Sequence, residues 1–210
     1  MTRLLIIFFL FVTNCTVSKV ETKEVIMEPI KYADFNTAYN YVRYFEGNYG
    51  WELYDPGGET YAGIARKYNK NWEGWLILDN YKKQNQVKKH DSIPILEFAT
   101  FDYYMKVWYT EGYSELRNQE IANYIFDYRN SGPIAYTHIR KVLNDLGFSV
   151  DNYGDLDPNL ILVLNLVDEK EFLEKLKHTR MKYYIRCVKK YPEQILFLEG
   201  WYNRVHDVDS

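Results

Sequence analysis

The sequence predicts a mainly helical fold. Apolar residues recur at intervals of three and four rather than alternating, which is the period of an α-helix. Several of these apolar runs follow Asp, Asn or Pro, the residue types that favour helix starts. One stretch differs: residues 46–64 hold five glycines and one proline, which indicates a loop with several turns or a small hairpin. The rest of the chain is organised around this glycine-rich stretch.

Length and charge narrow the range of functions. A chain of 210 residues fits one domain, or one domain and a small lobe, and can bury a substantial core. Its formal net charge of −3 argues against nucleic acid as a partner, because phosphate recognition favours a basic face. The 21 tyrosines suit half-buried helix contacts and platforms for carbohydrate, since each ring is flat and apolar with a polar tip.

The first 18 residues are typical of an export signal. Arg3 supplies a positive charge, and Leu4 to Val12 is an apolar run too short to span a bilayer. Cleavage after Ser18 is one expectation. The other is a lipoprotein signal in which Cys15 becomes the lipid anchor. Either way we expect export, to the periplasm or the membrane as a lipoprotein, or alternatively as a secreted protein.

Residues 19–33 lack periodicity and are expected to form a tether. A helix is then expected from the N-cap Asp34, because Phe35, Ala38, Val42 and Phe45 share one apolar face. Gly47 is expected to follow its C-terminus. Glu46 is thereby placed in the last turn, at the negative end of the helix dipole. That position is expected to raise its carboxyl pKa, as a general acid requires.

The remaining elements follow in order along the chain. A short hairpin is expected within 47–60, a short helix at 64–69 and a helix at 76–89. A helix that starts near Pro94 is expected to bury Phe98, Phe101, Met105 and Trp108. Further helices are expected from the cap Asn118 to residue 128, from Pro133 to 146, from the cap Asp157, from the cap Asp168 to 190, and over 193–207.

Two carboxylates and a hydroxyl lie in the glycine-rich stretch. Glu46, Asp55 and Thr60 have the residue types of a glycosidase site, in which a carboxylic acid protonates the leaving oxygen. They are equally compatible with turn and cap positions. Glu52 and Glu59 lie in the same loop and are alternatives to Asp55.

Three motifs together resemble a known family. Glu46-Gly47, followed by Asp55-Pro56-Gly57-Gly58-x-Thr60-x-x-Gly63-Ile64, resembles the N-terminal signature of glycoside hydrolase family 108, the peptidoglycan muramidases. Residues 126–133 and 200–205 resemble the opening and closing motifs of the helical peptidoglycan-binding-type region that follows in that family. The resemblance implies a lysozyme-like helical domain, with a catalytic lobe at 34–115 and a C-terminal lobe at 116–207.

The resemblance also implies roles for individual residues. Glu46 would be the general acid that cleaves the β-1,4 link between N-acetylmuramic acid and N-acetylglucosamine, with Asp55 and Thr60 as its helpers. The substrate would be the glycan strands of peptidoglycan. Residues expected to contact it are Tyr49, Trp51, Tyr54 and Asn130. The chain departs from the family at Asn48, which replaces a glycine, and at Trp51 and Tyr54, which replace polar residues.

Other functions remain open from the sequence alone. A lytic transglycosylase needs only one Glu and would leave 1,6-anhydro ends. A cell-wall-binding or secretion-assisting module without catalysis would bind sacculi and release nothing. No metal or other cofactor is expected, because the four histidines lack metal-ligand spacing. We expect a monomer.

Overall fold

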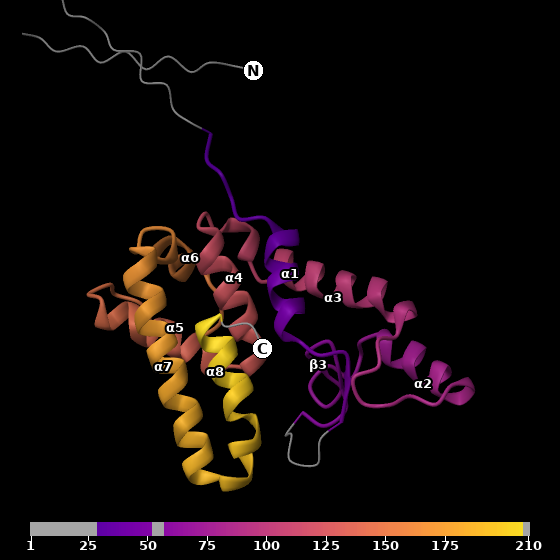
Figure 1. Ribbon diagram of the computed structural model, residues 1–210. Coiled ribbons are helices and arrows are strands. Elements are labelled where there is room, and N and C mark those ends of the chain that lie inside the picture. Colours follow the sequence, from indigo (N-terminus) through magenta and orange to yellow (C-terminus); the bar gives the residue numbers. More distant parts are fainter. Residues whose placement is uncertain (1–28, 52–56, 208–210) are drawn as a thin grey trace, which may run out of the picture.

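The computed structural model describes residues 29–51 and 57–207, which form a mainly helical fold with one small sheet (Figure 1). The α-helices are α1 (Phe35–Phe45), α2 (Gly74–Gln84), α3 (Glu97–Thr110), α4 (Gln119–Tyr128), α5 (Ile134–Asp145), α6 (Pro158–Leu164), α7 (Glu169–Lys190) and α8 (Leu198–His206). Short 3₁₀ helices are η1 (Pro94–Leu96), η2 (Tyr113–Glu115), η3 (Arg129–Ser131) and η4 (Pro192–Phe197). The predicted export signal, with Cys15, and the predicted site residues Tyr54 and Asp55 lie outside the described residues. Within the described ranges, no helix is long and apolar enough to cross a membrane.

Helix α1 forms as predicted and leads directly to Glu46. The Asp34 side chain accepts a hydrogen bond from the backbone N–H of Thr37 at 2.9 Å, which caps the first turn. Phe35, Ala38 and Val42 are buried, and this face packs against α4. Glu46 is the first residue after the helix, with an extended backbone at ψ 125°. Figure 1 shows this end of α1 directed towards the small sheet.

The small sheet has three antiparallel strands in the order β1 (Tyr49–Gly50), β2 (Thr60–Tyr61) and β3 (Ile64–Ala65). The predicted hairpin is therefore present as the β1–β2 pair. The helix predicted at 64–69 is wrong, because Ile64 pairs with Tyr61 across a two-residue turn. Ala62 and Gly63 in that turn both have positive φ, 49° and 78°. Left-handed dihedrals at both central residues match the twist of a tight hairpin.

Two helices differ from the sequence prediction. Helix α2 begins at Gly74 and ends at Gln84, so the predicted range 76–89 runs five residues too far. In α3 the buried face consists of Ala99, Thr100, Tyr104, Val107 and Trp108. Phe98, predicted to be inside, is 80% exposed. Its neighbours on the predicted stripe, Phe101 and Met105, are half-buried. The apolar face of α3 is therefore wider than its buried face. Tyr104 and Trp108 pack into the core, and their packing sets which side of the helix faces inwards.

The C-terminal helices begin where their caps were predicted. The side chains of Asn118, Asp157 and Asp168 each accept a hydrogen bond from a backbone N–H three residues on, at 2.9 Å. Helices α7 and α8 then lie side by side (Figure 1). Because α1 packs on α4, the two predicted lobes share one hydrophobic core. The predicted boundary at 115/116 stays a prediction.

Helix α5 carries a buried histidine. His138 is 5% exposed, and its Nδ1 lies 2.5 Å from the Tyr128 hydroxyl. Burial lowers its pKa to about 4, and the nearby charges of Arg186 and Lys141 act in the same direction. His138 is therefore neutral in the folded protein at pH values where the unfolded chain is protonated.

This burial predicts a loss of stability in mild acid. Above pH 6.5 His138 is neutral in both states, whereas between pH 6.5 and 4 only the unfolded chain gains its proton. The free energy of unfolding should fall by about 3 kcal/mol over that range. Urea unfolding at a series of pH values would measure it. His138→Gln should flatten this dependence, and His178→Gln, on the exposed face of α7, should leave it unchanged.

Candidate functional site

The Glu46 carboxyl, in the N-terminal half of the chain, is bound by two side chains of the C-terminal half. Its Oε1 accepts a hydrogen bond from the Asn130 amide at 2.8 Å and one from Arg204 Nη2 at 2.5 Å. Asn130 lies in η3 and Arg204 in α8, so both donors come from the C-terminal half. The Glu46 side chain is 13% exposed. A carboxyl is therefore held in a defined position and is still reachable from solvent.

The tight turn between β2 and β3 closes one side of this carboxyl. A Cβ atom added to Gly63 would lie 2.5 Å from Glu46 Cδ and 2.8 Å from its Oε2. Only a glycine fits at that distance, and its φ of +78° is a second reason for glycine there. The turn is held from behind, because the Tyr104 hydroxyl donates to the Ala62 carbonyl oxygen at 2.7 Å.

Behind Arg204 lies a buried carboxylate. The Asp127 side chain is fully buried, and its oxygens accept from Arg204 Nε at 2.9 and 3.0 Å and from Arg204 Nη2 at 2.5 Å. Arg180 Nη1 donates to the same carboxylate at 3.0 Å. Burial alone would raise the pKa of Asp127, but the two guanidinium groups lower that pKa below its ordinary value. Asp127 is thus a fixed negative charge that anchors Arg204.

Arg180 is itself held in a cage of tyrosines. Its guanidinium lies 4.3 Å from the ring centre of Tyr128, 5.3 Å from that of Tyr124 and 5.7 Å from that of Tyr184. Arg180 Nε also donates to the Tyr184 hydroxyl at 3.0 Å. Cation–π contacts of this kind compensate the loss of water around a buried cation. Four side chains of alternating charge therefore run from the surface into the core, in the spatial order Glu46, Arg204, Asp127, Arg180.

Tyr104 connects the glycine turn with the Asn130 side of the site. The Asn130 amide lies 3.3 Å from the Tyr104 hydroxyl, which in turn binds the Ala62 carbonyl oxygen. Burial raises the pKa of Tyr104 well above its ordinary value, and the negative charge of Glu46 raises it further. Tyr104 thus remains a neutral hydrogen-bonding group at pH values at which an exposed tyrosine would begin to ionise.

The other predicted site residues lie in different surroundings. Thr60 is in β2, and its hydroxyl donates to the Gly58 carbonyl oxygen at 3.1 Å. The Tyr49 hydroxyl donates to Glu59 at 3.1 Å. Trp51 is 59% exposed at the start of the loop. Of the seven predicted site residues, the structure places Asn130 against Glu46; Tyr54 and Asp55 fall outside the described ranges.

Glu59, an alternative to Asp55, is committed to an ion-pair cluster. Its carboxylate pairs with Lys82 and, at 2.7 Å, with Arg66 Nε. Arg66 also binds Asp79 through two hydrogen bonds and lies over the Trp75 ring at 4.6 Å. These partners tie the loop to α2. Glu59 therefore contributes to the structure of the loop, while Glu52, the other alternative, lies outside the described residues.

Arg204 and Asp127 are site residues that the sequence reasoning did not assign. Both lie in the motifs of the C-terminal half, at 126–133 and 200–205, and those motifs were the signal that could have found them. Their link to Glu46 spans 158 residues of sequence for Arg204. Local periodicity carries no information over that distance.

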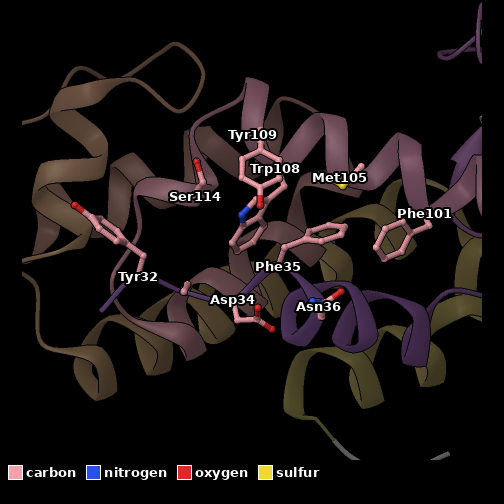
Figure 2. Close-up of a pocket in the computed structure, with 10 residues that line it drawn as sticks. Tyr32, Asp34, Phe35, Asn36, Phe101, Met105, Trp108, Tyr109 and Ser114 are labelled. Carbon is pink, nitrogen blue, oxygen red and sulfur yellow. The ribbon is translucent and has the colours of Figure 1, made fainter. Parts of the chain in front are cut away.

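Two hollows lie at opposite ends of α1. One, of about 340 Å³, is lined by Tyr44, Phe45, Phe197, Trp201, Asn203 and Arg204, and so adjoins the Glu46 site. The other, of about 380 Å³, lies at the N-terminal end of α1, with Phe35 and Trp108 near the centre of Figure 2. The carboxylate in its lining, Asp34, caps α1. The hollow beside Arg204 is therefore the better candidate for a substrate site, because it adjoins the Glu46 carboxyl. Among the described residues, no group of His, Cys, Asp or Glu is placed to hold a metal ion.

Gly63→Ala is expected to reduce activity more than stability. The new methyl group would push the Glu46 carboxyl away, and a displacement of about 1 Å can cost about 100-fold in rate. Gly147→Ala is the matched control, because Gly147 also has a positive φ, +90°, with open space around its Cβ position. Activity and thermal unfolding would be measured for both variants. Equal activity in the two variants would contradict the role given to the Gly63 contact.

Comparisons with known proteins show which family and fold the chain resembles. Residues 39–132 match the model of a family described as Glycosyl hydrolase 108. This range contains Glu46, Gly63, Tyr104, Asp127 and Asn130. A structure of SagA from Brucella abortus is similar in fold, with a TM-score of 0.56 and 21% identity, over 82% of this chain and 90% of that one. No curated protein matches the chain. The mainly helical, lysozyme-like fold predicted from the sequence is confirmed.

Proposed function

Because residues 39–132 match the family model described as Glycosyl hydrolase 108, we propose that this protein is a muramidase with Glu46 as its general acid. The bond cleaved is the β-1,4 link between N-acetylmuramic acid and N-acetylglucosamine in peptidoglycan. One observation carries the proposal. The family match includes a partly exposed carboxyl at a helix end, Glu46, which is fixed by an amide and a guanidinium from distant segments.

The hydrogen bonds of Glu46 support a different task for each of its two oxygens. Oε1 accepts from Asn130 and Arg204, whereas within residues 29–51 and 57–207 no hydrogen bond to Oε2 is found. We propose that Oε2 carries the transferred proton, because Oε1 already accepts two hydrogen bonds. This proton passes to the glycosidic oxygen as the bond from that oxygen to the anomeric carbon breaks. A water molecule adds to the carbon and releases one proton, which restores the acid form of Glu46 for the next cycle. Asp55 and Thr60 are proposed to position that water or to stabilise the positive charge on the sugar.

The surroundings of Glu46 suit a carbohydrate. Trp51 presents an exposed ring at the start of the glycine-rich loop, and the adjoining hollow combines Phe197 and Trp201 with the polar groups of Asn203 and Arg204. A sugar ring likewise has apolar faces and a polar edge, which is the mixture that ligand sites present. We propose that the glycan strand runs between these two surfaces, past Glu46.

Product analysis of purified sacculi tests this function. The protein is incubated with sacculi, the soluble fragments are reduced with borohydride, and the ends are identified by mass spectrometry. Muramitol ends are the expected result, because hydrolysis on the reducing side of muramic acid leaves a reducible end. 1,6-Anhydromuramic ends would instead identify a lytic transglycosylase. Binding to sacculi without soluble product would overturn the enzyme proposal and identify a binding module.

A further inference from the structure

The C-terminal helix α8 reaches the candidate catalytic carboxyl through one side chain. Arg204 Nη2 lies 2.5 Å from Glu46 Oε1, and the same nitrogen lies 2.5 Å from Asp127 Oδ1. The Arg204 side chain is 18% exposed, against 13% for Glu46 and none for Asp127. Burial alone would lower the pKa of Arg204, but the carboxylates of Asp127 and Glu46 raise that pKa well above its ordinary value. Arg204 is thus a permanent cation at the inner wall of the site.

The contact with Asp127 fixes the direction of the guanidinium. Arg204 Nε and Nη2 both donate to Asp127, and a guanidinium is rigid and planar, so two such bonds define its plane. A remaining N–H of Nη2 then points at Glu46 Oε1. Asp127 cannot shift to follow a different arginine position, because Arg180 holds it at 3.0 Å from the other side. The buried residues Asp127 and Arg180 therefore fix the position of Glu46 through Arg204.

A purely structural ion pair would not need this arrangement. Asp127 already has Arg180 as a buried partner, and this pair alone balances its charge. The second arginine balances a second carboxylate, Glu46, which lies at the site and not in the core. The hydrogen bond from Asn130 to the same Oε1 gives the carboxyl a second fixed point. Two donors on one oxygen set the torsion of the carboxyl, and the Gly63 turn lies against both of its oxygens.

We propose that Arg204 is a positioning residue for Glu46, which holds Oε1 so that Oε2 is the oxygen that delivers the proton. This inference rests on the proposed function. It makes the C-terminal half of the chain a part of the active site, in addition to any role in binding the cell wall. Such a residue affects the chemical step more than the binding of substrate.

Steady-state kinetics on soluble glycan fragments of peptidoglycan test the proposal. Arg204→Met keeps the apolar part of the side chain as far as the position of Nε and removes the donors, and kcat should fall by about 100-fold with KM within about threefold of the wild type. Arg204→Lys should recover part of kcat, because one ammonium can reach Oε1 but cannot bind Asp127 through two N–H groups. Arg186→Met, at an exposed position on α7, is the control and should match the wild type.

The outcomes separate this proposal from the function on which it rests. A wild-type protein that releases no product overturns the muramidase itself. An active wild type with a folded Arg204→Met variant of unchanged kcat overturns the positioning role alone. A raised KM with unchanged kcat would also overturn it, since Arg204 would then bind substrate. If thermal unfolding shows that the Met variant is not folded, Arg204→Gln replaces it, because an amide still donates to Asp127.

Discussion

Glu46→Gln is expected to reduce the release of muramic acid ends at least about 100-fold, since a positioned general acid contributes about 10² to 10⁴ in rate. Glutamine has the shape of glutamate, and its amide oxygen can accept from Asn130 and Arg204 as Oε1 does. The fold should therefore persist, while the group that carries the proton is gone. The assay is the release of soluble fragments from sacculi, with thermal unfolding recorded beside it.

Two further variants sharpen this test. Glu46→Asp keeps the acid but withdraws it by one methylene, and a withdrawal of about 1 Å should also cost about 100-fold. Glu120→Gln, at an exposed position on α4, is the control for loss of one carboxylate and should behave as the wild type. An active Glu46→Gln variant would mean that another carboxyl, such as Asp55, is the acid.

Asp127→Asn should have the largest effect on stability, a loss of about 3–5 kcal/mol, because it leaves Arg180 and Arg204 without their shared buried partner. Urea unfolding measures this loss. Asp145→Asn removes an exposed carboxylate paired with Lys141 and should change stability by about 0.5 kcal/mol or less. Equal losses of unfolding free energy in the two variants would show that the buried network stabilises the protein no more than an exposed ion pair does.

Asp127 also makes the stability of the protein depend on pH, in a more acidic range than His138 does. The pKa of Asp127 is lower in the folded protein than in the unfolded chain, where it is about 4. Its stabilising contribution is therefore complete above that unfolded value and is lost as the pH falls towards the folded one. The wild type should lose stability below about pH 4, and Asp127→Asn should lack this part of the loss.

The sequence predicts those features that depend on neighbouring residues. The caps Asn118, Asp157 and Asp168 were found because a side-chain acceptor and its helix lie within three residues of each other. The strand at Ile64 was missed because its pairing needs a positive φ at Ala62, a conformation that alanine rarely adopts. The outward position of Phe98 was missed because the rotation of α3 is set by partners far along the chain.

In the candidate site, too, some residues could be identified from the sequence and others depend on tertiary packing. Glu46 was identified from its place beside a helix end and from a family resemblance, and Asn130 from that resemblance. The pairing of Glu46 with Arg204 could not be predicted from local pattern, because it depends on how α8 docks, at a sequence separation of 158. The link from Asp127 to Arg180 depends on tertiary packing for the same reason.

The docking of α8 has a consequence for partial unfolding. Among the described residues of this helix, Val205 is the one that is fully buried, and the helix packs mainly against α7, where the Trp201 ring stacks on that of Tyr184 at 4.5 Å between centres. Segments of this kind open locally at a lower free-energy cost than the whole domain. Each opening would carry Arg204 away from Glu46 while the core of α1, α3 and α4 stays folded. The proposed activity should therefore be lost reversibly under conditions in which most of the helical structure survives.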